Sequence, residues 1–153
     1  MTKLLHTLWE SLLSPFSQRP KQMQVAALCY RGTGREKEVL MITSRGTGRW
    51  IIPKGWPMRG KDSSTAALQE AWEEAGVRNS RAKPEPIGSY TYDKVKNSGV
   101  SVPVEAFVYP VAVKDLADDF PEADERKRKW MRPADAAKAV QEPELKQILR
   151  ALS

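Results

Sequence analysis

Apolar and polar positions along this chain form short runs whose spacing changes from that of strands to that of helices. Residues 24–30 and 38–43 are continuous apolar runs of strand length on either side of a turn-rich segment, and this pattern predicts a β-hairpin. Residues 50–52 predict a short third strand. Three further strands are predicted at residues 87–93, 100–113 and 129–131. Pro103 and Pro110, both in the longest of these, predict an edge or a bulge there.

Helical spacing occurs in four places, at residues 3–13, 62–76, 133–140 and 143–152. The second of these helices is expected to begin at Asp62 or Ser63, because both are good N-cap residues. It is expected to end at Gly76, which suits the position just after a helix. Strands grouped before and after one central helix, with two helices at the end, predict an α+β layered fold.

The first helical pattern defines an N-terminal extension over residues 1–20, and residues 21–153 form the predicted domain. We interpret the extension as a helix that caps the domain or a partner subunit. A membrane-surface anchor is the alternative, although the polar face of this helix lacks a basic run. With 153 residues, 41% of them hydrophobic, the chain can build one compact domain with a core and has no room for a second.

The single cysteine, Cys29, lies in an apolar run, so no intramolecular disulfide can form and a reducing compartment is expected. No apolar stretch approaches the length of a membrane span, and no signal peptide is predicted. These observations predict a cytoplasmic protein that does not associate with a membrane. The oligomeric state is left open.

The formal net charge is +6, which favours anionic partners. Phosphorylated small molecules and nucleic acid both fit that charge, and the densest basic cluster lies at residues 125–129. Net charge concerns attraction and solubility rather than a site, so the side chains that do chemistry must be found elsewhere.

The central helix carries three glutamates on one face, at roughly 140°, 200° and 240° around its axis when Leu68 is taken as zero. They are Glu73, Glu70 and Glu74. Leu68, Ala71, Trp72 and Ala75 form the apolar stripe, so one side of the helix is expected to pack and the other to present acid. Carboxylates clustered in this way suit Mg²⁺, which also takes oxygens from substrate phosphates. A solvated acidic face is the alternative interpretation.

The stretch from Gly55 to Val77 resembles the Nudix box, G-x5-E-x7-R-E-U-x-E-E-x-G-U, where U is a bulky aliphatic residue. Six positions match at the required spacing: Gly55, Glu70, Glu73, Glu74, Gly76 and Val77. Three depart from it, with Lys61 at the first Glu position, Gln69 at the Arg position and Ala71 at the first U position. Residues 49–55 and 126–130 extend the resemblance to the diphosphoinositol polyphosphate phosphohydrolase branch, over roughly residues 22–152.

This resemblance implies an α/β/α sandwich around a mixed sheet and the hydrolysis of a nucleoside diphosphate linked to another moiety, or of a similar pyrophosphate such as a dinucleoside polyphosphate. Glu70 and Glu74, one turn apart, are the expected ligands of Mg²⁺, or of Mn²⁺ in its place. Glu73 stands at the position of a base that deprotonates water. The residues expected to bind substrate are Arg45, Trp50, Lys54, Gly55, Arg126 and Arg128.

The departures from the box leave other functions open. Gln69 supplies no charge where the family has an arginine that orients a glutamate, and Lys61 cannot ligate a metal as an ammonium. A nucleotide-binding regulatory module with weakened turnover is therefore one alternative, and an enzyme that trims RNA 5′ ends is another, although nucleic acid is not the favoured partner. Gln22, Gln24 and the Glu142-Pro143 pair stand where inositol pyrophosphate enzymes carry basic side chains, which argues against a highly phosphorylated inositol.

Overall fold

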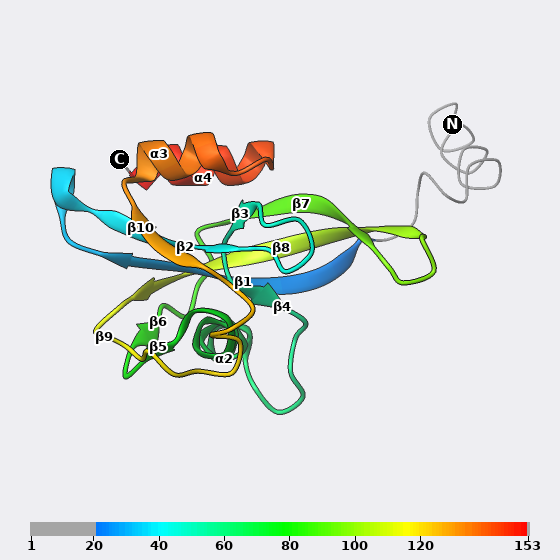
Figure 1. Ribbon diagram of the computed structural model, residues 1–153, viewed down its shortest axis with the longest axis horizontal. Helices are drawn as coiled ribbons and strands as arrows, with labels where there is room; N and C mark the ends of the chain where they lie inside the picture. Colours follow the sequence, from blue (N-terminus) through cyan, green and yellow to red (C-terminus); the bar gives the residue numbers. More distant parts are fainter. Residues whose placement is uncertain (1–20, 153) are drawn as a thin grey trace, which may run out of the picture.

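A computed structural model describes residues 21–152 of the chain (Figure 1). The helix predicted at residues 3–13 lies outside the described residues, so the division into an extension at 1–20 and a domain at 21–153 stays a prediction. The strands are β1 (Gln22–Arg31), β2 (Glu38–Thr43), β3 (Trp50–Ile51), β4 (Lys54–Gly55), β5 (Val77–Arg78), β6 (Arg81–Ala82), β7 (Gly88–Val95), β8 (Ser101–Ala112), β9 (Asp115–Leu116) and β10 (Arg128–Met131). The helices are η1 (Gly34–Glu36), α2 (Ser63–Ala75), α3 (Pro133–Ala139) and α4 (Pro143–Leu152).

Eight of the strands form one mixed sheet. Five of them follow the order β10-β2-β1-β8-β6, and the other three pair alongside: β3 with β2, β4 with β1 and β7 with β8. Strands β1 and β8 are parallel, and the other pairs are antiparallel. Strand β1 also pairs with β4, so Lys54 lies opposite Ala26 and Gly55 opposite Val25. The predicted hairpin of β1 and β2 is confirmed by the pairing of Tyr30 with Val39.

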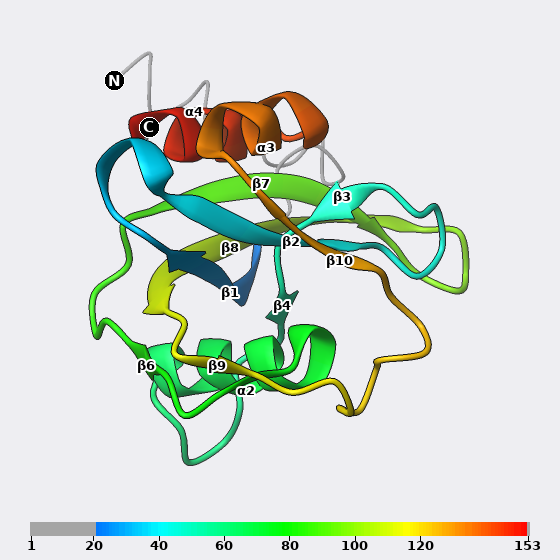
Figure 2. The same ribbon diagram turned by 60° about the vertical axis from the view of Figure 1, so that its left-hand side comes forward.

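Helices cover both faces of this sheet, as Figures 1 and 2 show: α2 lies on one side, and α3 and α4 lie together on the other. Successive side chains of β1 point to opposite faces of the sheet. Val25 and Ala27 contribute to the core beside α2, whereas Ala26 and Leu28 contribute to the core beside α3 and α4. The predicted α+β sandwich with a mixed sheet is therefore confirmed.

Strand β8 corrects one expectation, because it pairs with β1 on one side and with β7 on the other and is not an edge. Its two prolines lie where pairing with a neighbour stops. Pro103 directly precedes Val104, where pairing with β1 begins. Pro110 lies between the pairing with β7, which ends at Val108, and the pairing with β6, which begins at Val111.

The ends of α2 agree with the sequence. The carboxylate of Asp62 accepts a hydrogen bond from the backbone N–H of Thr65 at 2.8 Å, which caps the helix. Gly76 ends it with φ of 74°, in the left-handed region that glycine adopts without strain. Gly76 is also closely surrounded, because an added Cβ would crowd the Phe120 ring and the guanidinium of Arg128.

The burial of α2 differs from the sequence prediction. Its buried face consists of alanines and two of the glutamates: Ala66, Ala67, Glu70, Ala71, Glu74 and Ala75. Leu68 and Trp72 are only partly buried. The small alanines let the helix approach the sheet beside β4, and Glu70 and Glu74 share that packed face instead of pointing away from it.

Candidate active site

Glu70 and Glu74 lie in a pocket of about 280 Å³ at the junction of α2, β4 and β7. Its acidic residues are Glu70, Glu74 and Glu122, and its basic residues are Arg45, Lys54, Lys94 and Arg126. Helix α2 and the connection between β9 and β10 supply the acids, whereas the bases come from four separate segments. The pocket therefore combines carboxylates with the cations that an anionic substrate requires.

Gly55 forms the floor beneath Glu70. A Cβ added at Gly55 would overlap the carboxyl group of Glu70, so only glycine lets the two approach this closely. The backbone N–H of the preceding Lys54 donates to Glu74 Oε1 at 3.3 Å. Strand β4 thus holds both carboxyl groups of α2 through its backbone, which gives a physical reason for glycine at the first position of the box.

The pKa of Glu70 is raised to about 8, first by burial and then by the hydrogen bond and the negative charge of neighbouring Glu74. Burial also raises the pKa of Glu74, although the positive charge of Arg126 opposes that effect. Near neutral pH, without a cation, Glu70 therefore retains a proton that it shares with Glu74. A cation that neutralised the pair would displace this proton.

Arg126 links the acids on the two sides of the pocket. Its guanidinium bonds Glu122 Oε1 through Nε and Nη2, both at 3.0 Å, and Nη2 lies 3.7 Å from Glu74 Oε1. Nη1 donates to the carbonyl of Thr43 at 3.0 Å. Only 7% of the side chain is exposed, so most of its donors are already used by the protein. Its position suits holding the carboxylates of Glu74 and Glu122 in place better than binding the substrate directly.

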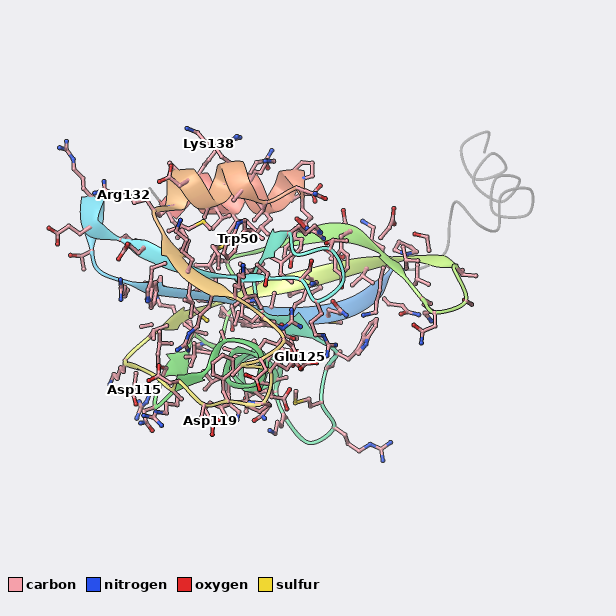
Figure 3. The ribbon with its side chains drawn as sticks, in the orientation of Figure 1. Trp50, Asp115, Asp119, Glu125, Arg132 and Lys138 are labelled. Atoms are coloured by element: carbon pink, nitrogen blue, oxygen red, sulfur yellow. The ribbon has the colours of Figure 1, made fainter. Side chains whose placement is uncertain are left out.

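Arg45 is the more accessible arginine, with 57% of its side chain exposed. It lies 3.6 Å from Glu122 and 3.4 Å from Glu125, pairs that cost little to break at an exposed site. Figure 3 shows Glu125 on the side of the sheet that faces α2. Arg45 can therefore turn toward a phosphate group without leaving a buried charge unpaired.

Lys54 forms the wall opposite the acids. Burial lowers the pKa of Lys54 to about 8, and the charge of Glu74 opposes this effect. Its ammonium lies 5.0 Å from the centroid of the Tyr92 ring. Burial raises the pKa of Tyr92 to about 12, so its hydroxyl keeps its proton and donates a hydrogen bond to the Gln24 side-chain oxygen.

Glu73 lies at the edge of this arrangement and is not among the residues that line the pocket. Its carboxylate accepts a hydrogen bond from Gln69 Nε2 at 3.2 Å, and the oxygen of the same amide accepts one from Lys61 Nζ at 3.4 Å. Two of the three residues that depart from the box, Lys61 and Gln69, are therefore neighbours. Lys61 places its positive charge next to the amide that holds Glu73.

The structure does not bring two of the predicted substrate-binding residues to the pocket. Trp50 packs against the core beside α3 and α4, and Figure 3 shows it on that side of the sheet. Arg128 donates to the carbonyl of Ala75 at 2.7 Å and lies 3.4 Å from Asp118, where it caps the end of α2. Both residues have structural contacts that account for their positions.

Sequence reasoning missed three residues that line the pocket: Tyr92, Lys94 and Glu122. Glu122 lies in an irregular acidic segment that has no periodicity and no motif. Tyr92 and Lys94 are two positions apart in β7, so their side chains project from the same face of the strand. That spacing was visible in the sequence, but the partner across the pocket was not.

Within residues 21–152, no three Asp, Glu, His or Cys side chains converge into a ready-made metal cluster. Glu70 and Glu74 provide a pair instead. Two protein carboxylates are characteristic of Mg²⁺ sites, in which water and substrate phosphates complete the coordination. The residues present thus fit a divalent cation that binds together with a phosphorylated substrate.

A family model described as "NUDIX domain" matches residues 20–152. Diphosphoinositol polyphosphate phosphohydrolase 3-beta from Homo sapiens is 31% identical over 121 residues, which cover 77% of this chain and 68% of that protein. This chain belongs to the NUDIX family. Members of the family generally use divalent metal ions. The predicted family branch and the enzyme class, a hydrolase of phosphoric anhydride bonds, are confirmed.

Two solved structures show the same NUDIX fold. The Ap4A hydrolase of C. elegans has a TM-score of 0.62 and 21% identity, and the match covers 86% of this chain and 95% of that one. A NUDIX family hydrolase from Clostridium perfringens has a TM-score of 0.63 and 18% identity, with 88% and 97% covered. At these identities the likeness concerns the fold alone. No helix within residues 21–152 is both long and apolar enough to span a membrane.

Proposed function

We propose that this protein is a Mg²⁺-dependent pyrophosphohydrolase that cleaves a nucleoside diphosphate linked to another moiety, or a dinucleoside polyphosphate. The observation that carries the proposal is the buried pair Glu70 and Glu74, which faces Lys54 across a pocket that also contains Arg45. The two acids can bind a cation and the two basic side chains can bind phosphates, so the pocket suits a pyrophosphate group. Mn²⁺ is the alternative metal.

Glu70 and Glu74 would hold the metal, which when bound neutralises phosphate charge and activates the attacking water. Lys54 and Arg45 would hold the phosphate oxygens, and Gly55 leaves space for the Glu70 carboxyl group beside them. Arg126 would keep Glu74 and Glu122 in position. Positioning and neutralisation of charge provide most of the rate enhancement expected for such a reaction.

Glu73 is our proposed base. Its carboxylate is held by an amide and not by a cation, so accepting a proton would break no ion pair. Glu122 is the competing acid in the pocket, but protonating it would weaken its contacts with both Arg126 and Arg45. Glu73→Gln should therefore reduce kcat about 100-fold or more, and Glu122→Gln should reduce it less.

Nucleotide substrates are favoured over highly phosphorylated inositols. Glu142 is buried and its carboxylate accepts two hydrogen bonds from Arg49 Nη1, at 3.1 and 3.2 Å, so this ion pair leaves no free cation there. Gln24 lines the pocket as a neutral side chain. The relatives named diphosphoinositol polyphosphate phosphohydrolases and the Ap4A hydrolase fold support the wider class, which is hydrolysis of pyrophosphate bonds.

A substrate panel with a metal titration tests the proposal. The panel contains dinucleoside polyphosphates, nucleoside diphosphate sugars and an inositol pyrophosphate, each incubated with wild-type protein and with Glu74→Gln. We expect hydrolysis of a nucleotide substrate that requires Mg²⁺ and falls at least 100-fold in Glu74→Gln. Asp118→Asn is the matched control, because Asp118 is an exposed acid outside the pocket. Equal rates for wild type and Glu74→Gln would overturn the proposed metal site.

A nucleotide-binding module without turnover is the second candidate, and it is supported by Lys61 and Gln69 within the box. Tight nucleotide binding in calorimetry with no product from any substrate would favour it. RNA with a 5′ triphosphate belongs in the same panel, because steep loss of its binding with salt would support an RNA-directed enzyme. The cytoplasmic location is part of the proposal. Cys29 is buried, and burial raises the pKa of its thiol to about 12, which is consistent with that location.

A further inference from the structure

An aromatic residue stands at the mouth of the pocket without a role in the core. Trp56 is 40% exposed and lines the pocket, and it belongs to neither of the two hydrophobic clusters of the described residues. The other three tryptophans within residues 21–152 are less exposed. Core packing therefore does not account for Trp56.

Trp56 forms one side of what we term the aromatic wall, which consists of Lys54, Trp56, Tyr92 and Lys94. The Lys94 ammonium lies 5.5 Å from the centroid of the Trp56 ring, and the Lys54 ammonium lies 5.0 Å from that of Tyr92. Each segment contributes one lysine and one aromatic ring, two positions apart. Two cations are thus held against aromatic faces next to the acids.

The small size of the pocket favours an arrangement in which part of a nucleotide lies at this wall. At about 280 Å³, the pocket is smaller than the roughly 300–1,000 Å³ typical of sites that enclose a drug-sized ligand. Phosphates bound between Lys54 and Glu74 would fill its interior. The group attached to them must then extend over the rim, where Trp56 presents an exposed indole.

We propose that Trp56 is the stacking platform for the nucleobase of the substrate, with Lys94 directed toward the adjacent phosphate. This inference rests on the proposed function and names the residue that selects nucleotides. A substrate ring that carries only phosphate groups would need a cation for each phosphate, and the face of an indole offers phosphate no hydrogen bond. A base, in contrast, gains stacking energy from an exposed aromatic face.

A matched pair of probes tests the platform by calorimetry in Mg²⁺. Adenosine 5′-methylenediphosphonate and methylenediphosphonate carry the same non-hydrolysable phosphorus chain, with and without the nucleoside. We expect Trp56→Ala to weaken binding of the first about 5- to 140-fold, the range that loss of one stacked base implies, and to leave binding of the second within twofold. Trp72→Ala is the control, because Trp72 lies on α2 outside the pocket.

Two further variants distinguish stacking from simple contact. Trp56→Phe keeps an aromatic face and should retain most of the preference for the nucleoside probe, whereas Trp56→Leu should lose it. Equal losses on both probes, or equal behaviour of the Phe and Leu variants, would overturn the platform. Circular dichroism of each variant confirms folding before the titration.

Failure of this inference can be told apart from failure of the proposed function, because binding of these probes needs no turnover. If wild type hydrolyses a nucleotide substrate but Trp56→Ala keeps the preference for the nucleoside probe, only the platform is wrong. If Trp56→Ala loses that preference but wild type and Glu74→Gln both lack activity, the platform stands and catalysis is wrong.

Discussion

The two faces of the sheet use their helices differently. Helix α4 buries Leu145 and Leu149 completely, and these large side chains fill the core beside α3. Helix α2 buries alanines together with Glu70 and Glu74. Burying carboxyl groups costs free energy, and the same burial raises the pKa of Glu70 to about 8. One face therefore stabilises the fold, and the other gives up stability to hold the two carboxyl groups that we propose bind metal.

The stabilising face gives the largest expected effect. Leu149→Ala removes a fully buried side chain from the core beside α4, which should lower the free energy of unfolding by about 3 kcal/mol. Denaturant unfolding measures this change. Hydrolysis per folded molecule should stay within twofold, and a large loss of kcat in the folded variant would show that the two faces are not separate.

The reactive face should respond in the opposite way. Gly55→Ala places a Cβ where the Glu70 carboxyl lies, so Glu70 must move away from Glu74. We expect Mg²⁺ affinity and kcat to fall about 10- to 100-fold, the range found when metal ligands lose their support. Calorimetric titration with Mg²⁺ and assay of the same sample measure both. The control is Gly46→Ala, since an added Cβ at Gly46 meets no atom within 4 Å and its backbone is not left-handed. Wild-type Mg²⁺ affinity in Gly55→Ala would refute the close contact.

The dependence of Mg²⁺ affinity on pH tests the buried pair. Below about pH 8 Glu70 carries a proton that the metal must displace, so affinity should rise about tenfold for each pH unit up to that value and then level off. The stability of the metal-free protein should change with pH in the opposite direction. The folded state holds this proton more tightly than the unfolded chain, whose carboxyl has a pKa near 4.5. The free energy of unfolding should therefore fall as the pH rises from 4.5 to about 8. Calorimetry in two buffers counts the released protons, and affinity independent of pH would contradict the shared proton.

The smallest effect is expected at Gln69. Gln69→Arg restores the arginine of the box, but Arg126 already supplies the cation beside Glu74 and Lys61 lies next to the new charge. Hydrolysis should therefore change less than threefold. The double variant Lys61→Glu/Gln69→Arg removes the repulsion between the cations and should equal or exceed the single variant. A gain of tenfold or more in Gln69→Arg alone would mean that the departures from the box limit catalysis.

The sequence by itself determined the order of the larger elements and the limits of α2, because hydrophobic spacing, the Asp62 cap and Gly76 act locally. It also predicted Glu70 and Glu74 as the acids of the site, and the structure places both in the pocket. The strands β4, β5, β6 and β9 escaped prediction, since two residues each are too few to show a period; β3, which is equally short, was predicted only because it lies in an apolar run at residues 50–52.

The tertiary structure alone decided which way α2 faces. From spacing, Leu68 and Trp72 belonged to the packed side, but both are only partly buried, whereas Glu70 and Glu74 lie on the buried side next to β4. It also selected Arg126 over Arg128 for the pocket, although the two are neighbours in sequence. The contact between Arg126 and Glu74 joins residues about 50 positions apart, and no local pattern encodes it.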